Sequence, residues 1–480
     1  MNESIDVVDM PDQLTAFDAL MHRGEANPRT RSGIMAIQIL QSTPDWNRFR
    51  DLFDNASRRI PRMRQKVVVP TLPTIAPRWV VDPDFNLDFH IRRARVTTPG
   101  TLRDVLDMAE LMVQAPLDIS RPLWSVTLVE DMTEGRAAVL MHMSHAVSDG
   151  MGSVAMFEQI FDFTPDAPAK PTAPLPVPMD LTANDLMRAG ISRLPGALIR
   201  GLGRTVSGAA QTVARAVSQP VTAATTAIDY VRSGSRLMTP AATPSPLLRR
   251  RSFASRSECL DMPLAALQAA AKAAGGSLND AYLAALCGAL RRYHDALGMP
   301  VTTLPMAIPV SLRAEGDPAG GNRFTGVSLA APIAETDPVK RINTIHAQMV
   351  MRREEAALDV VSVIAPILSV LPDAVMEVMA GSFTPADVQA SNVPGFSGDI
   401  YLAGSKIVRQ YGLGPLPGVA MMVSLVSLGG VCTVSVRYDR ASITDVDLFA
   451  RCLEEGFDEV LALSGNRSAR ATVTSLAGDA

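Results

Sequence analysis

One stretch of the chain passes directly from a strand signal into a helix signal. Residues 137–145 form a mostly apolar run that is typical of a buried strand, and residues 151–161 carry the apolar spacing of a helix. Asp149 and Gly150 lie between the two, where a carboxylate can stabilise the positive end of a helix and a glycine permits a tight turn. This segment predicts a mixed α/β unit with a cleft at the end of the strand.

His145 is the last residue of the expected strand. Because side chains alternate along a strand, His145 shares a face with Met141 and Met143. Ser144 and His142 point to the opposite face. An imidazole with its ordinary pKa of about 6.5 can accept a proton at neutral pH, so His145 is a candidate base. The alternative is a structural histidine, which is the more common role of a single histidine at the end of a strand.

Several other kinds of site have no motif in the sequence. The chain contains no GxSxG nucleophile elbow, no HExxH zinc motif, no GxxxxGK[ST] phosphate loop and no GxGxxG dinucleotide motif. His142 and His145 lack a third ligand at usable spacing, so no metal is expected. The four cysteines form no CxxC pair, and the formal net charge of −4 gives no reason to expect nucleic acid as a partner.

The length and a proline-rich segment indicate how the chain is divided. A chain of 480 residues is too long for one hydrophobic core and predicts two domains. Residues 165–178 contain six prolines, which exclude a helix interior or a central strand and mark a surface connector. We therefore expect an N-terminal domain over 1–164, a connector with basic helices over 165–256, and a C-terminal domain over 257–480.

A strongly basic segment overlaps this connector. Residues 186–256 hold eleven arginines and a single acidic residue, Asp229, interleaved with small and apolar residues. The spacing suits one or two basic amphipathic helices that lie on an anionic membrane or lipid surface. A solvated helical bridge over the two domains fits the same pattern slightly better, and both interpretations stay open.

Residues 412–436 form the longest uncharged stretch and are long enough to raise the question of a membrane span. Pro415 and Pro417 disfavour a spanning helix, and the second half of the stretch predicts two strands joined at Gly429 and Gly430. The acidic N-terminus lacks the basic and apolar regions of a secretion signal. We therefore expect a cytoplasmic protein.

Several motifs occur in the order found in one known family. The segment SHAVSDG at 144–150 resembles the HHxxxDG motif of the CoA-dependent acyltransferase superfamily, which includes chloramphenicol acetyltransferase and peptide-synthetase condensation domains. Further segments narrow the resemblance to the bacterial wax ester synthase/diacylglycerol acyltransferase family, and they cover almost the whole chain. These segments are DPDFNLDFHIRRARVTTPG (82–100), PLDISRPLWSVTLVED (116–131), SLNDAYLAALCGALRRY (277–293), PVSLR and GNRF (within 309–324), SNVPGF (391–396) and GLGPLPGVAMMVSLVS (412–427).

The resemblance implies an α/β fold of two mixed-sheet domains, of the chloramphenicol acetyltransferase type, with the active site in a tunnel between them. It also implies transfer of a fatty acyl group from acyl-CoA, used as a co-substrate without a cofactor, to diacylglycerol or a long-chain alcohol. Because such acceptors are lipids, residues 186–256 are expected to attach the protein peripherally to the inner membrane or to lipid droplets.

The resemblance further implies roles for three catalytic candidates. His145 matches the second histidine of the motif, the general base that takes the proton of the acceptor hydroxyl. Asp149 matches the motif aspartate, which orients the loop. Asn279 matches the asparagine of an Asn-Asp motif that supports the site from the second domain. Asn279 fits equally well as a helix-capping residue beside Ser277.

Three further residues are candidates for contact with substrate. Gly150 allows a tight backbone after the motif, Trp124 is expected near the tunnel, and Asn392 belongs to the SNVPG segment. A plain core role is the favoured alternative for Trp124, and a simple turn is the alternative for Asn392.

The sequence departs from the family motif at position 144, where serine replaces the first histidine. Because Ser144 is expected to point away from His145, the base need not be lost, which favours retained chemistry with an altered structure or rate. Two alternatives stay open: a polyketide-associated acyltransferase whose donor is a carrier protein, and a lipid-binding paralogue that has lost turnover. His142 shares the face of Ser144, but we do not expect it to replace the missing histidine.

Overall fold

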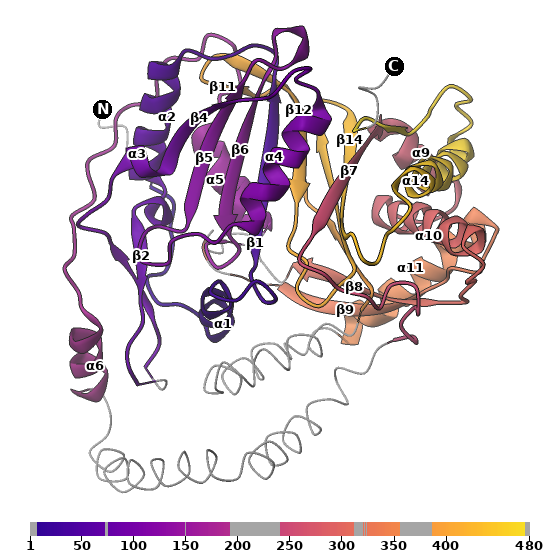
Figure 1. The fold of residues 1–480 in the computed structure, drawn as a ribbon, viewed down its shortest axis with the longest axis horizontal. Helices are drawn as coiled ribbons and strands as arrows, with labels where there is room; N and C mark the ends of the chain where they lie inside the picture. Colours follow the sequence, from indigo (N-terminus) through magenta and orange to yellow (C-terminus); the bar gives the residue numbers. More distant parts are fainter. Residues whose placement is uncertain are drawn as a thin grey trace, which may run out of the picture.

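The computed structural model describes residues 7–72, 75–148, 150–192, 241–311, 320, 322, 324–355 and 386–475. Within these residues two large mixed β-sheets lie side by side, each covered by helices (Figure 1). This arrangement confirms the expected α/β fold of two mixed-sheet units. A separate pair of strands and several short helices complete the first unit. These are β2 (Gln65–Val68), β3 (Arg78–Val81), α1 (Ala16–Gly24), α3 (Leu87–His90) and α6 (Ala183–Ser192).

The first sheet lies between helices on both faces. Val105 and Ala109, one helical turn apart on α4 (Leu102–Gln114), are buried against one face of the sheet. Phe49 and Phe53 on α2 (Trp46–Arg59) are buried on the other face together with α5 (Gly150–Ile160). In order across the sheet, the strands are β11 (Tyr401–Leu402), β12 (Ser405–Leu413), β1 (Gly33–Leu40), β6 (Ala137–Ser144), β5 (Trp124–Glu130) and β4 (Ile91–Arg95).

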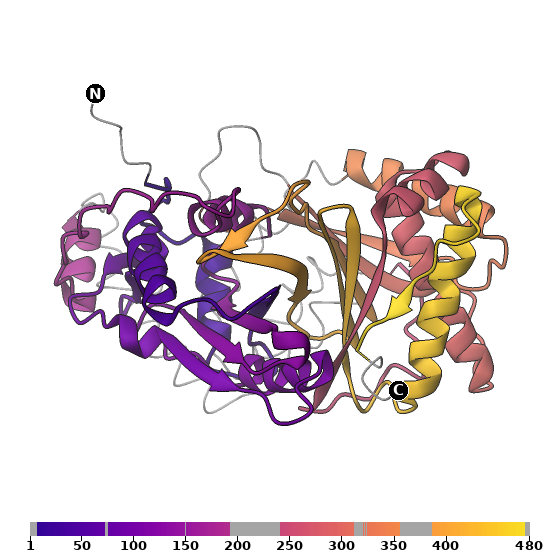
Figure 2. The same cartoon turned by 90° about the horizontal axis from the view of Figure 1, so that it is seen from above.

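The second sheet packs its helices on one face, which is the outer face of the molecule in Figure 2. The helices are α9 (Leu264–Ala273), α10 (Leu278–Ala296), α11 (Pro338–Glu355) and α14 (Val446–Leu461). In order across the sheet, the strands are β15 (Thr472–Val473), β7 (Ser255–Pro263), β14 (Val431–Asp439), β13 (Met421–Leu428), β10 (Val388–Asn392), β8 (Leu304–Ser311) and β9 (Phe324–Ala331).

The hairpin expected within the long uncharged stretch is confirmed. Strands β13 and β14 pair antiparallel, with Leu428 opposite Val431. Gly429 and Gly430 form the two-residue turn with positive φ angles of 54° and 84°, a conformation that glycine adopts without a steric cost. Most side chains of the two strands are buried in the second sheet, whereas the glycines of the turn are exposed.

The chain crosses between the two sheets after β10. Strands β11 and β12 follow β10 in sequence, yet they join the first sheet, where β12 pairs antiparallel with β1. The chain then returns to the second sheet as β13. The domain ranges expected from the sequence stay a prediction, but part of the range 257–480 belongs to the sheet of the N-terminal range.

Helices α10 and α14 approach each other closely at Gly456. A Cβ atom built on Gly456 would lie 2.4 Å from the backbone nitrogen of Ala289 and 2.7 Å from the carbonyl oxygen of Ala285. The variant Gly456→Ala must push the two backbones apart, so we expect its free energy of unfolding to fall by about 1–3 kcal/mol. Chemical denaturation followed by circular dichroism measures the change.

Gly326→Ala is the matched control for this variant. A Cβ on Gly326 would meet no atom within 4 Å, so its stability should stay close to that of the native protein. Equal stabilities of the two variants would show that the helices do not approach as closely as the structure has them.

Candidate active site

His145 lies in the turn that directly follows β6, where it is partly buried. Its main-chain N–H donates to the carbonyl oxygen of Ser32 at 3.1 Å, which anchors the turn to the residue before β1. The expected alternation along the strand is confirmed. Met141 and Met143 are buried in the core on the α5 side, whereas Leu140 is buried on the α4 side.

The His145 imidazole meets a residue from the second half of the chain. Its Nδ1 atom lies 2.8 Å from Oδ1 of Asn322, in a hydrogen bond between residues 177 positions apart. The Nδ2 group of Asn322 donates to the carbonyl oxygen of His145 at 2.8 Å and to Oδ1 of Asp18 at 2.8 Å. Asn322 and Asp18 are both buried, so the base candidate sits where two halves of the molecule meet.

Ser144 and His145 have separate hydrogen-bond partners, and the expectation that their side chains point to opposite faces stays a prediction because His145 lies in the turn after β6. The Ser144 hydroxyl donates to Oε1 of Glu25 at 2.6 Å and accepts from the N–H of Ala146 at 3.2 Å. The hydroxyl of Ser32 donates to the same Glu25 oxygen at 2.9 Å. Glu25 is 1% exposed and Ser144 is fully buried. The serine that replaces the motif histidine therefore ties the turn to a buried carboxylate.

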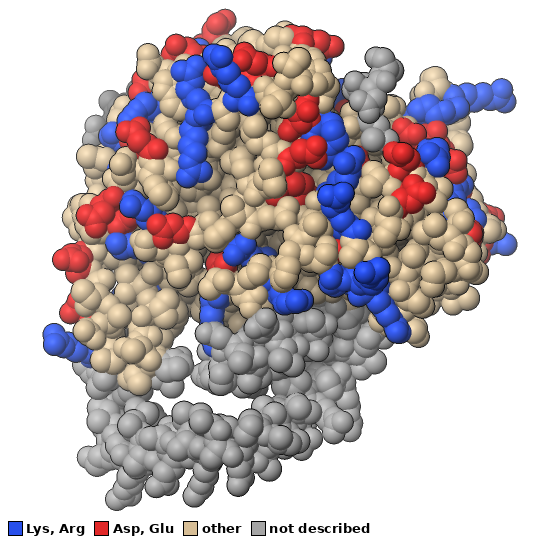
Figure 3. Space-filling model, in the orientation of Figure 1, with Lys and Arg blue, Asp and Glu red and all other residues tan. Residues whose placement is uncertain are grey.

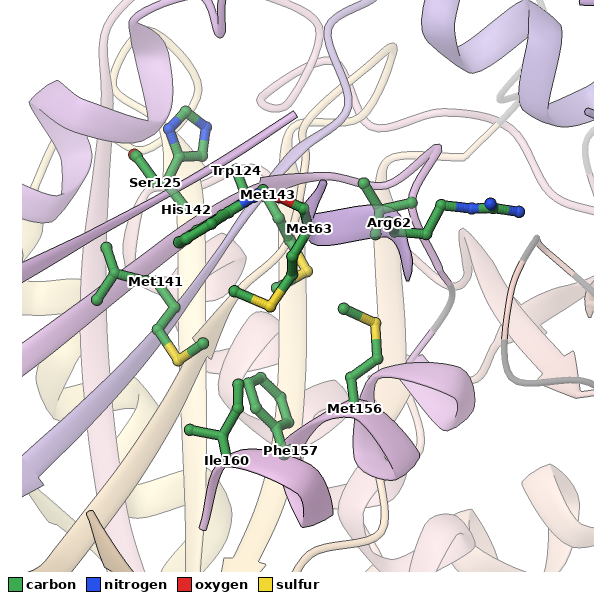
Figure 4. A pocket seen from close by; sticks show the side chains of 12 residues that line it. Arg62, Met63, Trp124, Ser125, Met141, His142, Met143, Met156, Phe157 and Ile160 are labelled. Carbon is green, nitrogen blue, oxygen red and sulfur yellow. Dashed lines mark hydrogen bonds between the residues drawn. The ribbon is translucent and has the colours of Figure 1, made fainter. Parts of the chain in front are cut away.

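An apolar cavity lies on the α5 side of β5 and β6. Its free volume is only about 10 Å³, roughly the room that one water molecule needs, and every residue that lines it comes from the first unit. Figure 4 shows Met63, Met156 and Phe157 turned toward one another and the ring of His142 pointing away from them. The lining also includes Trp124, Met141, Met143 and Val147. Met143 and Val147 lie two residues before and two residues after His145.

His142 does not take the place of the missing histidine. Its ring is 4% exposed, and burial, together with the positive charges of Arg437 and Arg31, lowers its pKa to about 4. A Cβ on Gly33 would lie 2.9 Å from the Nε2 atom of His142, so the ring is packed tightly against β1. His142 is a neutral core residue at neutral pH.

Trp124 is both a core residue and a wall of the cavity. It is 4% exposed, and its indole N–H donates to the carbonyl oxygen of Met63 at 2.8 Å. The indole stacks on the His90 ring with centroids 4.6 Å apart. Gly150 begins α5, and Asp149 lies outside the described residues, so its expected role stays a prediction.

Asn279 is the second residue of α10 and does not cap it. The cap is Ser277, whose N–H and hydroxyl donate to Oδ2 of Asp280 at 2.8 and 2.7 Å. The same carboxylate oxygen lies 2.7 Å from Nδ1 of His346 on α11. The capping alternative for Asn279 is therefore wrong, and no hydrogen bond among the described residues joins Asn279 to His145. Asn392 is exposed at the end of β10.

The site contains three residues to which the sequence assigned no role. Asp18 and Glu25 lie seven positions apart, two helical turns, in and just after α1, so both face the His145 turn. Asn322 belongs to the GNRF segment that resembles the family, but nothing local indicates that it would reach the base. Only the hydrogen bond between the two halves of the molecule shows that Asn322 belongs to the candidate site.

Contact with lipid would depend on the helices and on the surface charge of the protein. Among the helices of the described residues, none combines the length and apolar character that crossing a bilayer requires. On the face in Figure 3, acidic and basic side chains of the described residues are interspersed. Residues 193–240, which hold most of the expected basic helices, lie outside the described part of the chain.

Two family models match the chain. The model described as the wax ester synthase/diacylglycerol acyltransferase catalytic domain matches residues 8–282, and the model of the WS/DGAT C-terminal domain matches residues 320–460. A protein of Mycobacterium tuberculosis H37Rv, named a putative diacylglycerol O-acyltransferase, is 63% identical over 470 residues. The match covers 98% of this chain and 96% of the relative.

Two solved structures have the same fold. The wax ester synthase/diacylglycerol acyltransferase from Marinobacter aquaeolei VT8 matches with a TM-score of 0.65 at 19% identity, covering 94% of this chain and 100% of that chain. The first condensation domain of the calcium-dependent antibiotic synthetase matches with a TM-score of 0.60 at 13% identity, covering 96% and 98%. These likenesses concern the fold and confirm the expected type of paired mixed-sheet units.

Removal of the Ser144 hydroxyl tests its structural role. Ser144→Ala leaves the buried Glu25 carboxylate with one hydroxyl donor fewer, so we expect the free energy of unfolding to fall by about 1–3 kcal/mol. Ser397→Ala, at an exposed serine, is the control and should cost less than about 0.5 kcal/mol. Equal losses in urea denaturation would rule out a special role for the Ser144–Glu25 bond.

The lowered pKa of His142 predicts a pH dependence of stability. The unfolded chain, with a histidine pKa of about 6.5, takes up a proton before the folded protein does as the pH falls. This contribution to stability is present above pH 6.5 and is lost as the pH falls toward 4. When the pH falls from 7 to 4.5, the free energy of unfolding of His142→Leu should decrease by about 2 kcal/mol less than that of the native protein. Parallel losses in urea denaturation would contradict the burial of a neutral ring.

Proposed function

Because the chain belongs to the wax ester synthase/diacylglycerol acyltransferase family, we propose that it transfers a fatty acyl group from acyl-CoA to diacylglycerol or to a long-chain alcohol. The product is triacylglycerol or a wax ester. The observation that carries the proposal is the position of His145, directly after β6 and between Met143 and Val147 of the cavity lining, with a hydrogen bond to the second half of the chain.

The reaction needs one base and no covalent intermediate. The His145 imidazole takes the proton of the acceptor hydroxyl while the hydroxyl oxygen attacks the thioester carbonyl carbon. The tetrahedral intermediate collapses with cleavage of the carbon–sulfur bond, and the CoA thiolate leaves and receives the proton from the imidazolium. A positioned base of this kind contributes a rate increase of roughly 10²- to 10⁴-fold.

The composition of the cavity supports a fatty acyl substrate. Methionine side chains are unbranched and flexible, so a cavity lined by Met63, Met141, Met143 and Met156 can widen from its present volume of about 10 Å³ to admit an apolar chain. Met143 and Val147 place this surface next to the His145 turn. An acyl chain in the cavity would bring its carboxyl end toward the base. The tunnel between the two halves, expected from the resemblance, remains part of this proposal.

Ser144 is compatible with turnover. Its hydroxyl is occupied with Glu25, neither residue lines the cavity, and the neighbouring His145 keeps its own partners. The first position of the motif thus serves the shape of the turn, which a serine maintains here through a different bond. This argument favours an active enzyme over a paralogue that has lost turnover.

We further propose that the protein works at a lipid surface, because its acceptors are lipids. The eleven arginines of residues 186–256, set against one acidic residue, supply the positive charge that anionic membranes attract. Peripheral attachment to the inner membrane or to lipid droplets would give the site access to its acceptor.

The test is release of free CoA thiol from palmitoyl-CoA, with dioleoylglycerol or hexadecanol as the acceptor. We expect acceptor-dependent release by the native protein, and a loss of roughly 10²- to 10⁴-fold in His145→Ala because the base is removed. His346→Ala, at a partly exposed histidine on α11, is the matched control and should retain activity. The preferred acceptor identifies the product.

The other outcomes separate the alternatives. Release that appears only in Ser144→His would mean that the natural protein is disabled at this position. Transfer from an acyl carrier protein without transfer from palmitoyl-CoA would assign the chain to carrier-dependent acylation. Equal activity of His145→Ala and the native protein would eliminate His145 as the base.

A further inference from the structure

Three hydrogen bonds of the Asn322 side chain settle the orientation of its amide. The nitrogen Nδ2 lies 2.8 Å from the carbonyl oxygen of His145 and 2.8 Å from Oδ1 of Asp18. Both oxygens act only as acceptors, so the donating end of the amide must face them. The amide oxygen then faces Nδ1 of His145 at 2.8 Å. Because this oxygen cannot donate, the hydrogen of that bond belongs to Nδ1.

We propose that Asn322 is a positioning residue that holds the hydrogen of the neutral His145 imidazole on Nδ1. The nitrogen that carries a hydrogen in a neutral imidazole is selected by the hydrogen bond that it makes. The lone pair is thereby kept on Nε2, which is the atom that takes the proton of the acceptor hydroxyl. The inference rests on the proposed function for its consequence in catalysis, although the assignment of the hydrogen itself does not.

Asp18 holds Asn322 in this orientation. Its Oδ1 atom accepts from the main-chain N–H of Asn322 at 3.0 Å and from the side-chain amide at 2.8 Å. Its Oδ2 atom accepts from the N–H of Thr15 at 3.4 Å, and its own N–H donates to the Thr15 hydroxyl at 3.1 Å. This capping box fixes the carboxylate at the positive end of α1, where its negative charge is favoured.

A buried cation lies close to the same carboxylate. Arg62 is 2% exposed, and burial lowers its pKa to about 9, while the negative charges of Asp18 and Asp12 act in the opposite direction. A Cβ on Gly320 would lie 3.4 Å from Nη2 of Arg62, so the chain passes this guanidinium two residues before Asn322. The attraction between Arg62 and Asp18 offsets part of the cost of burying the carboxylate.

The three parts of the network come from distant segments of the chain. Asp18 lies on α1, His145 follows β6, and Asn322 precedes β9 of the second sheet. Asn322 and Asp18 are 304 positions apart in sequence. The His145 imidazole is consequently oriented only when both halves are folded together, because His145 and Asp18 come from the first half and Asn322 comes from the second.

The first experiment reads the hydrogen position directly in the full-length native protein. Histidine-selective ¹⁵N labelling and two-bond ¹H–¹⁵N correlation spectra at pH 8.5 show which ring nitrogen of each of the six histidines is protonated. The His145 signals are those that disappear in His145→Ala. We expect the hydrogen on Nδ1. A hydrogen on Nε2 in the native protein would overturn the proposal without any further variant.

The second experiment removes the amide. In Asn322→Ala we expect the His145 hydrogen to redistribute toward Nε2 and kcat to fall at least about tenfold, because the base is then in the wrong form. The KM for palmitoyl-CoA should change less than about threefold. Asn343→Ala, at an exposed asparagine on α11, is the matched control and should keep both the spectrum and kcat.

The results for this residue and for the proposed function are separable. A native protein with the hydrogen on Nδ1 but without acyl transfer to any acceptor would remove the proposed function and leave the assignment standing. An Asn322→Ala protein that keeps the hydrogen on Nδ1 together with full kcat would refute the positioning role, even if acyl transfer itself is confirmed.

Discussion

Main-chain hydrogen bonds between β1 and β12 hold the two halves of this molecule together. The strands pair antiparallel from Met35 opposite Leu413 to Leu40 opposite Ile407. Since a slip of one residue would turn every side chain to the other face of the sheet, this ladder fixes the register of the C-terminal half on the N-terminal sheet. The Thr433 hydroxyl on β14 donates to the carbonyl oxygen of Gln410 at 2.6 Å and ties β12 to the second sheet. The position of everything between the halves depends on this shared strand.

Buried charges at the same junction make the arrangement specific. Glu110 on α4 accepts from the Ser255 hydroxyl at 2.6 Å and from Nε of Arg437 at 3.2 Å, and the carboxylate and guanidinium are both nearly inaccessible to water. Loss of one partner of such a pair costs about 3–5 kcal/mol, because it leaves an uncompensated buried charge. Any displacement of one sheet along the other would separate these groups. The rigidity of the junction is what allows Asn322 to be held within hydrogen-bond distance of His145.

The hydrogen bonds around residues 144 and 145 separate the role of the serine from that of the histidine. Ser144 and His145 each connect to a different buried carboxylate, Ser144 directly to Glu25 and His145 to Asp18 through Asn322. Both carboxylates belong to the first helical segment, two turns apart. Substitution of Ser144 therefore alters the fit of the turn to Glu25 without removing any hydrogen bond that orients the imidazole.

Features whose cause lies within a few residues could be predicted from the amino-acid sequence. The alternation around His145, the β13–β14 hairpin at Gly429 and Gly430, and the Ser277 cap of α10 all follow from strand periodicity, turn chemistry and capping. The ordered motifs likewise identified the family, because each is a local pattern. The role proposed for Asn279 had no such local cause, and the structure gives it neither the cap nor a bond to His145.

Tertiary structure alone decided which distant segments share a site. The placement of β12 beside β1, of Glu25 under Ser144 and of Asn322 against His145 joins residues from 119 to more than 300 positions apart. The spacing of residues in the sequence does not predict such pairs. They form because the two sheets pack against each other and because each buried polar group needs a hydrogen-bond partner. The sequence therefore predicted that His145 lies at the end of a strand, and the contact between the halves decided which side chain binds its imidazole.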